Sequence, residues 1–267
     1  MKNRIILAVA PTGGWGKRYN NPVKPTSIAE DVVNCVKAGA SIVHLHSRDK
    51  QGELTTDLSS FSQAVSTIKK KCDVILEAST GGLSDLSAAE RVLPASNTNA
   101  EMGSLNIGSL NFGNHVYQNK LTDVRFWIET MTKYRVKPSL EIFDTGHMET
   151  ALSLINEGLI TLPCNFSLIF DVKWGMPFHP ALLEYLKSRI PEKCRWTALL
   201  INSTDFLNHL VAAHAGASVL RVGFEDSFAY NGKTALSNAE LVKALRVELE
   251  QNGFSIATAD EARAILL

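Results

Sequence analysis

The stretch Ser41-Ile42-Val43-His44-Leu45-His46-Ser47-Arg48-Asp49 begins as a short apolar run and ends in polar loop residues. It lies between two segments in which apolar residues recur with helical spacing, 27–37 and 58–71. The same order of apolar run, polar loop and amphipathic segment repeats along the chain. Eight short apolar runs occur, at 4–10, 41–46, 73–79, 101–106, 137–143, 165–170, 195–201 and 218–222. Strands that alternate with helices of this length indicate βαβ units and a parallel sheet.

Amphipathic segments follow the apolar runs at 27–37, 58–71, 86–93, 122–134, 147–157, 180–188, 205–213 and 238–251. Eight such units in about 250 residues are typical of a closed (β/α)8 TIM barrel. A doubly wound open sheet is the alternative. Thr258 is suited to cap one more short helix over 258–267. No linker-like stretch divides the chain, so we expect a single α/β domain over 1–267.

Composition and charge narrow the class of protein. The 267 residues are 45% hydrophobic, and 27 basic residues balance 27 acidic ones. This balance argues against a protein that binds nucleic acid or a membrane surface, which would carry a basic excess. The first apolar run is shorter than the roughly 7–15 residues of a signal-peptide core, and no run approaches the ~18 residues of a membrane span. The four cysteines form no C-x-x-C pair, which suits the reducing cytoplasm.

The histidines of the opening stretch are the sharpest chemical signal. Side chains alternate between the faces of a strand, so His44 and His46 point to the same side. Two imidazoles on one face can bind one divalent metal, although both could equally be hydrogen-bonded structural residues. The polar residues after His46 mark the carboxyl end of a strand, where the active sites of barrels lie.

A two-histidine metal site usually takes a carboxylate as its third ligand. Glu225, just past the eighth run, is the best candidate for that ligand. Arg221 and Asp226 lie within the same six residues. A solvated loop with an arginine–aspartate ion pair is the alternative interpretation of this cluster.

Other polar groups also follow the predicted strands. Ser79-Thr80-Gly81-Gly82 comes after the third run and could bring hydroxyl and backbone donors close to a carboxylate or phosphate, although an ordinary turn explains it equally well. We place Ser104-Leu105-Asn106 and Ser109-Leu110-Asn111-Phe112-Gly113 at the end of the fourth strand, and Glu141 and Asp144 at the end of the fifth. Together these positions predict a site at the loops after strands 2, 3, 4, 5 and 8.

The combination resembles one known family, the β-keto acid cleavage enzymes. The resemblance runs nearly end to end and preserves the order of the motifs. It rests on Ala10-Pro11-Thr12-Gly13, Asn21-Pro22, Ala38-Gly39-Ala40, Val43-His44-Leu45-His46-Ser47-Arg48-Asp49, Ser79-Thr80-Gly81-Gly82, Ser104-Leu105-Asn106, Asn111-Phe112-Gly113, Glu141-Ile142-Phe143-Asp144-Thr145-Gly146 and Arg221-Val222-Gly223-Phe224-Glu225-Asp226.

The resemblance implies a homo-oligomeric TIM barrel, a dimer or tetramer, that carries Zn²⁺ on His44, His46 and Glu225. It implies condensation of a β-keto acid with acetyl-CoA, which releases acetoacetate and a new acyl-CoA. Asp226 matches the base that removes a C2 proton. The residues that match groups orienting this base or the substrate are Arg221, Ser79, Ser104 and Glu141. We further expect Thr80, Gly81, Gly82, Asn106 and Trp15 to bind the substrate.

Three segments depart from the family pattern. They are Leu200-Ile201-Asn202-Ser203, Gly216-Ala217-Ser218 and Trp174, which stands where glycine is usual. The departures affect the thioester and substrate side, so a metal-dependent carbon–carbon lyase that does not use CoA stays open, as does a non-catalytic small-molecule-binding barrel.

Trp15 bears on the substrate class. In the aminohexanoate-cleaving members of the family a carboxylate at the corresponding position receives the ammonium group of the substrate. Trp15 cannot neutralise an ammonium group as a carboxylate does, so we expect a keto acid with an uncharged, short aliphatic side chain. Packing of Trp15 beneath the first loop is the alternative.

Overall fold

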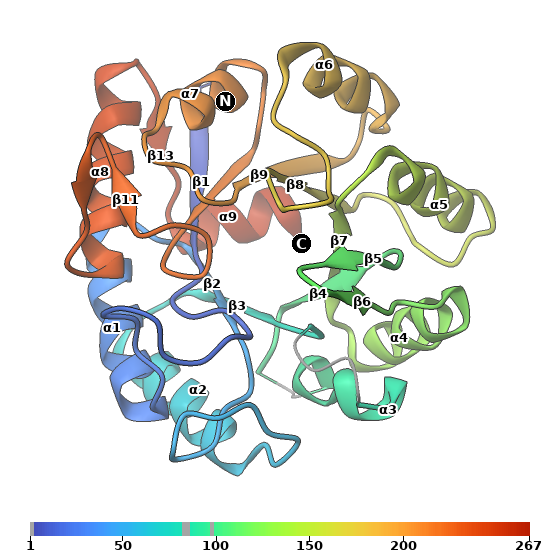
Figure 1. Ribbon diagram of the computed structural model, residues 1–267, viewed down its shortest axis with the longest axis horizontal. Coiled ribbons are helices and arrows are strands. Elements are labelled where there is room, and N and C mark those ends of the chain that lie inside the picture. Colours follow the sequence, from blue (N-terminus) through green and yellow to red (C-terminus); the bar gives the residue numbers. More distant parts are fainter. Residues whose placement is uncertain (1–2, 82–85, 97–98) are drawn as a thin grey trace.

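A computed structural model describes residues 3–81, 86–96 and 99–267. Within these ranges, eight parallel strands form a closed barrel, because β1 pairs with both β2 and β10 (Figure 1). The barrel strands are β1 (Arg4–Val9), β2 (Ile42–Leu45), β3 (Ile75–Ala78), β4 (Met102–Asn106), β7 (Lys137–Ile142), β8 (Asn165–Phe170), β9 (Arg195–Leu200) and β10 (Val219–Val222). All eight lie in the predicted apolar runs. Because the sheet is closed, the alternative of a doubly wound open sheet is excluded.

Helices surround the barrel in Figure 1. They are α1 (Pro25–Ala38), α2 (Ser59–Lys71), α3 (Ala88–Arg91), α4 (Leu121–Tyr134), α5 (Thr145–Asn156), α6 (Pro180–Arg189), α7 (Leu207–His214) and α8 (Asn238–Gln251). A 3-10 turn, η1 (Leu93–Ser96), follows α3. In the described part of the chain, no helix is both long and apolar enough to span a lipid bilayer.

The amino-terminal end of the barrel is closed by the last helix, α9 (Ala259–Leu266), which follows the short strand β13 (Ser255–Ile256) beside β1. Thr258 caps α9 as predicted, because its hydroxyl accepts from the Glu261 N–H and the Glu261 carboxylate accepts from the Thr258 N–H. An apolar layer fills the barrel beneath this helix. It consists of Ile6, Ala8, Ile42, Ile75, Met102, Val219, Ala257, Ala262 and Leu266. Polar side chains therefore gather in the opposite half of the barrel.

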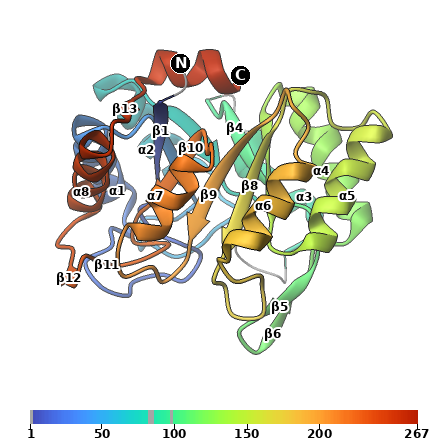
Figure 2. The same cartoon turned by 90° about the horizontal axis from the view of Figure 1, so that it is seen from above.

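Two short hairpins extend from the carboxyl end of the barrel, and sequence analysis missed both. They are β5 (Leu110–Phe112) with β6 (His115–Tyr117), and β11 (Ala229–Tyr230) with β12 (Lys233–Thr234). The placement of 109–113 at the end of the fourth strand is wrong, because β4 ends at Asn106. A Cβ at Gly108 would lie 2.6 Å from the His147 ring, so the backbone between β4 and β5 passes too close to α5 for a larger residue. Figure 2 shows the β5–β6 hairpin projecting from the barrel.

Candidate active site

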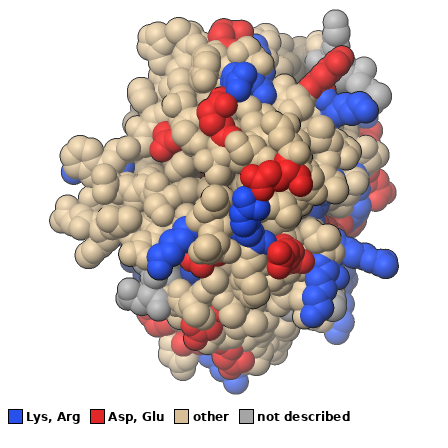
Figure 3. Space-filling model, turned by 90° about the vertical axis from the view of Figure 1, so that its right-hand side faces the viewer, with Lys and Arg blue, Asp and Glu red and all other residues tan. Residues whose placement is uncertain are grey.

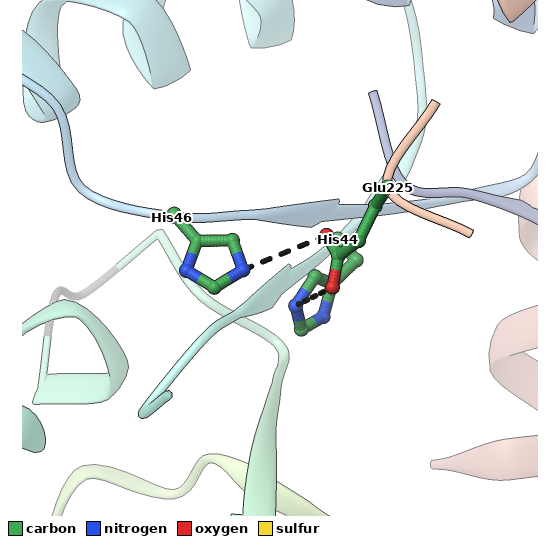
Figure 4. A group of neighbouring side chains, drawn as sticks. All are labelled: His44, His46 and Glu225. Atoms are coloured by element: carbon green, nitrogen blue, oxygen red, sulfur yellow. Dashed lines mark ion pairs between the residues drawn. The ribbon is translucent and has the colours of Figure 1, made fainter. Parts of the chain in front are cut away.

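The sequence-predicted ligands His44, His46 and Glu225 meet at the mouth of the barrel. His44 Nε2 lies 3.9 Å from Glu225 Oε1, and His46 Nε2 lies 3.5 Å from Glu225 Oε2. One nitrogen or oxygen from each residue lies within 4.8 Å of the other two. Figure 4 shows both imidazole rings turned toward the Glu225 carboxylate. One residue on β2, one directly after it and one on the loop after β10 thus form a compact N, N, O donor set.

Several atoms of this group are buried without a hydrogen-bond partner. They are both ring nitrogens of His46 and Oε2 of Glu225. A buried polar atom without a partner costs free energy, so such atoms in a native structure call for an explanation. A cation bound by His46 Nε2 and Glu225 Oε2 would provide one for these two atoms. Two imidazoles and a carboxylate are ligands that Zn²⁺ accepts while leaving a position open for substrate, so the residues present fit a catalytic metal.

Glu77 on β3 is a functional candidate that sequence analysis missed. It is the register partner of His44 across the β2–β3 pair, and its Oε2 lies 3.5 Å from His44 Nδ1. A carboxylate behind a metal-binding histidine fixes the ring orientation and raises the basicity of the ligand nitrogen. No local pattern in the run 73–79 marks this role, because the contact depends on the register between two strands.

The loop after β10 is shaped by Gly223. Its φ is +141° and a Cβ there would lie 2.2 Å from the Ala10 carbonyl oxygen. This close approach lets the Glu225 N–H donate to the same Ala10 oxygen at 3.1 Å. The end of β1 therefore fixes the backbone that carries Glu225.

Asn238, at the start of α8, holds the same loop from the other side. Its Oδ1 accepts from the Phe224 N–H at 2.7 Å, and its Nδ2 donates to Asp31 Oδ2 at 2.8 Å. Asn238 is fully buried. A helix far along the chain thus positions the residue next to Glu225, and sequence analysis gave no sign of this contact.

Arg221 and Asp226 form a buried bidentate ion pair. Arg221 Nε donates to Asp226 Oδ2 at 2.9 Å, and Nη2 donates to Oδ1 at 2.6 Å. Arg221 Nη2 also lies 3.4 Å from Glu225 Oε1. The ion pair considered as an alternative for this loop is thus present, but it is buried beside the candidate metal ligands rather than solvated. It links the candidate base to the candidate metal ligand.

The buried carboxyl groups differ in their ionisation. Burial raises the pKa of the Asp226 carboxyl, although Arg221 opposes the shift. Burial also raises the pKa of Glu141 to about 7, and that carboxyl faces Arg221 within the barrel. Burial would raise the pKa of Glu225 too, but Arg221, His44 and His46 together hold it well below its ordinary value. Glu225 is therefore an anion suited to bind a cation, whereas Glu141 can hold a proton near neutral pH.

A second group of predicted residues lies at the ends of β3 and β4. The Ser79 hydroxyl accepts from the Gly81 N–H at 3.1 Å, while the Thr80 N–H donates to the Ser104 hydroxyl at 3.2 Å. The Thr80 hydroxyl donates to the Ser104 carbonyl. Both polar atoms of the Asn106 side chain are buried without a partner. This amide is thus free to bind a ligand, while Gly82 lies outside the described residues.

Two aromatic residues complete the surroundings. A Cβ at Gly81 would lie 2.7 Å from the Tyr117 hydroxyl, so the β5–β6 hairpin reaches the β3 loop, which the sequence did not indicate. A Cβ at Gly13 would lie 2.9 Å from Glu225 Cγ and 3.0 Å from the Trp15 ring. Trp15 therefore lies beside Glu225, and its indole nitrogen is buried without a partner.

The chain is similar to known proteins along nearly its whole length. A model of the beta-keto acid cleavage enzyme family matches residues 4–267. The chain belongs to this family. A 3-keto-5-aminohexanoate cleavage enzyme from Fusobacterium nucleatum is 34% identical over all of this chain and 98% of its own length. The family membership and the barrel thus confirm the resemblance inferred from the motifs.

One further relative and one solved structure are also similar to this chain. A 3,5-dioxohexanoate:acetyl-CoA acetone transferase from Paraburkholderia graminis is 28% identical over 99% of this chain and 96% of its own length. The solved structure of ObcA in a ternary complex with a C4-CoA adduct and oxalate has a TM-score of 0.79 at 20% identity. The match covers 92% of this chain and 67% of ObcA, and it supports the fold.

Proposed function

We propose that this protein condenses a β-keto acid with acetyl-CoA and releases acetoacetate and a new acyl-CoA. The observation that carries the proposal is the compact N, N, O donor set of His44, His46 and Glu225, with the Arg221–Asp226 pair directly beside it. Family membership and the acetyl-CoA-dependent activity named for the Paraburkholderia relative support the same reaction. We also propose that the chain is one barrel domain and works as a homo-oligomer in the cytoplasm.

His44, His46 and Glu225 would hold the metal, which we propose to be Zn²⁺. When bound, the ion would supply a Lewis acid that polarises the keto oxygen and so acidifies the neighbouring CH₂ group. Glu77 would hold the His44 ring in its binding orientation, and the Gly223 turn would hold Glu225.

Asp226 would act as the base that removes a proton from C2 of the keto acid. A base within reach of its proton, with a pKa near the working pH, transfers it most effectively, and burial shifts the pKa of Asp226 upward toward that range. Arg221 binds both carboxylate oxygens, so it would fix the orientation of the base. Glu141 faces Arg221, so by holding or releasing its own proton it would change the net charge of the groups around this pair.

The bond changes balance without an oxidant or reductant. The C2 carbanion attacks the acetyl thioester carbonyl, and the CoA thiolate leaves. That thiolate then attacks the original keto carbonyl, and the bond from this carbon to C2 breaks. The products are the new acyl-CoA and the acetoacetate carbanion, which regains its proton from Asp226.

The β3 and β4 loops would bind the carboxylate of the keto acid. The Asn106 amide is buried without a partner beside the turn of Ser79, Thr80 and Gly81, and Ser104 holds that turn. We also propose Gly82, which lies outside the described residues, as a substrate-binding residue. Trp15 lies beside Glu225 and offers an apolar wall, so we propose a short aliphatic keto acid without a charged side chain.

The decisive experiment is a screen of short β-keto acids with the purified protein, scored by acetyl-CoA-dependent formation of acetoacetate. Turnover of 3-oxopentanoate or 3-oxohexanoate is expected to exceed that of 3-keto-5-aminohexanoate in kcat/KM. The opposite order would refute the role of Trp15. Turnover that needs no acetyl-CoA would instead identify a carbon–carbon lyase, and a protein that binds keto acids without converting them would be a binding barrel.

A further inference from the structure

The loop between β8 and α6, residues 171–179, contains an unusual exposed tryptophan. Trp174 is 62% exposed, yet its φ is +77°. A bulky residue with a positive φ is an energetically costly outlier, and such outliers cluster at ligand sites. Asp171 in the same loop also has a positive φ, of +64°. The backbone therefore adopts a costly conformation that leaves a large aromatic ring in solvent.

The loop is held firmly in this conformation. The Asp171 N–H donates to the Met176 carbonyl at 2.9 Å, and the Gly175 N–H donates to the Val172 carbonyl at 2.8 Å. The Phe178 N–H donates to the Asp171 carboxylate at 2.9 Å. These bonds fix the backbone on both sides of Trp174, so the ring is presented by a rigid support.

The indole is also fixed at its edge. Its Nε1 donates to the Gly113 carbonyl, at the turn of the β5–β6 hairpin, at 3.0 Å. Figure 2 shows this hairpin and the β8–α6 loop at the same end of the barrel. The Lys173 ammonium lies over one face of the indole ring, 4.8 Å from its centre. A ligand stacked on the opposite face would therefore have a cation close by for any anionic group that it carries.

The hairpin connects this tryptophan to the candidate active site. Phe112 precedes Gly113 in this hairpin, and the centre of its ring lies 6.1 Å from the centre of the Tyr117 ring. The Tyr117 hydroxyl in turn lies next to Gly81. Residues 102–119 contain no lysine, arginine, aspartate or glutamate, and His115 is their one titratable basic residue. The projecting left edge of the molecule in Figure 3 is correspondingly almost free of charged residues. An aromatic, uncharged edge thus leads from Trp174 to the substrate turn.

We propose that Trp174 is the stacking platform for the adenine ring of acetyl-CoA, with Lys173 beside its phosphates. The inference rests on the proposed function. Bases stack on exposed aromatic side chains, and cations bind the adjoining phosphates. Of the two substrates, acetyl-CoA alone carries an aromatic ring joined to anionic groups. Its long pantetheine arm can place the thioester at the metal ligands while the adenine lies at the rim of the barrel.

The test replaces Trp174 by glycine, because glycine adopts a φ of +77° without strain and so preserves the loop. Tyr134→Ala is the matched control. Tyr134 is also exposed, at 44%, and has the Lys133 ammonium 5.6 Å from its ring, but it ends α4 just before β7 begins, at the other end of the barrel. Trp174→Phe should lose less binding than Trp174→Gly, because it retains an aromatic face.

Two readouts separate the possibilities. In Trp174→Gly, the KM for acetyl-CoA and the Kd for adenosine 3′,5′-bisphosphate, measured by calorimetry, should both rise about tenfold, as expected for loss of one stacked base. The kcat and the KM for S-acetyl-N-acetylcysteamine, which lacks the nucleotide, should not change. Tyr134→Ala should match the wild type in every measurement.

Unchanged binding of the bisphosphate in Trp174→Gly would overturn the proposal. So would an equal loss with S-acetyl-N-acetylcysteamine, which would place the effect at the catalytic centre, or a change of subunit assembly, which would make this edge a contact between copies of the chain. A wild-type protein that never uses acetyl-CoA would contradict the proposed function instead, and the bisphosphate titration would still test Trp174.

Discussion

Gly223→Ala is the substitution that most directly tests how the barrel positions Glu225. A Cβ at this position would lie 2.2 Å from the Ala10 carbonyl oxygen, about 1.2 Å short of the 3.4 Å at which ordinary contact begins. The carbonyl cannot simply move aside, because it accepts from the Glu225 N–H and belongs to the residue whose N–H donates to Val222. The new methyl group must therefore displace the loop that carries Glu225.

The size of the effect follows from two contributions. A non-glycine residue in a sparsely populated backbone region costs roughly 1–3 kcal/mol, and φ at Gly223 is +141°. Loss of the Glu225–Ala10 hydrogen bond adds about 1 kcal/mol. We expect the free energy of unfolding of Gly223→Ala to fall by about 2–4 kcal/mol, measured by denaturant titration, and the bound metal to be lost, measured by elemental analysis.

Gly216→Ala is the matched control, because φ there is +98° but a Cβ would meet nothing within 4 Å. It carries the cost of the backbone conformation without the collision, so it should lose less stability and keep its metal. If the two variants lose the same stability and both retain full metal occupancy, the close approach to Ala10 does not position Glu225 and the reasoning fails.

The remaining predictions concern the base, the orienting carboxylate and a buried aspartate. Asp226→Asn should retain the metal and lose at least ~10²-fold in kcat, whereas His46→Ala should lose metal and activity together; metal loss in Asp226→Asn would contradict the separation of roles. Glu77→Gln should weaken metal affinity by roughly 10–100-fold in a chelator competition, and an unchanged affinity would show that His44 needs no orienting carboxylate. Burial raises the pKa of Asp31 from 3.8 to about 6, so the stability from its bound proton is complete below pH 3.8 and is lost as the pH rises through 6. At 1.36 kcal/mol per pKa unit this amounts to about 3 kcal/mol, and denaturant titrations at pH 4 and pH 7 should show Asp31→Asn losing less stability over this interval than the wild type; equal losses would mean that Asp31 does not hold the proton.

The barrel could be predicted because its strands are short, apolar and separated by helices of regular length. Each predicted run contains one barrel strand, and Thr258 caps the last helix. The β5–β6 hairpin could not be predicted in the same way. Its residues continue the apolar character of β4. The glycine between the two, Gly108, passes close to the His147 ring, and this approach joins residues from different βα units.

The candidate ligands were visible because His44 and His46 are spaced for one face of a strand and Glu225 follows the last strand. Glu77 and Asn238 were not, since each acts through a partner that is distant in sequence. Glu77 meets His44 only in the observed register, and Asn238 reaches the Phe224 N–H from the start of α8. Their residue types alone would fit an ordinary buried polar side chain equally well.

The same alternation that reveals a barrel strand also conceals which of its inward residues are functional. Ile75 and Glu77 lie two positions apart on β3, and His44 lies two positions after Ile42 on β2. A period of two places all four inside the barrel. Ile42 and Ile75 pack in the apolar layer beneath α9, while His44 and Glu77 lie one layer nearer the mouth. The position of α9, which closes one end only, therefore leaves the polar layer of the barrel free to serve as an active site.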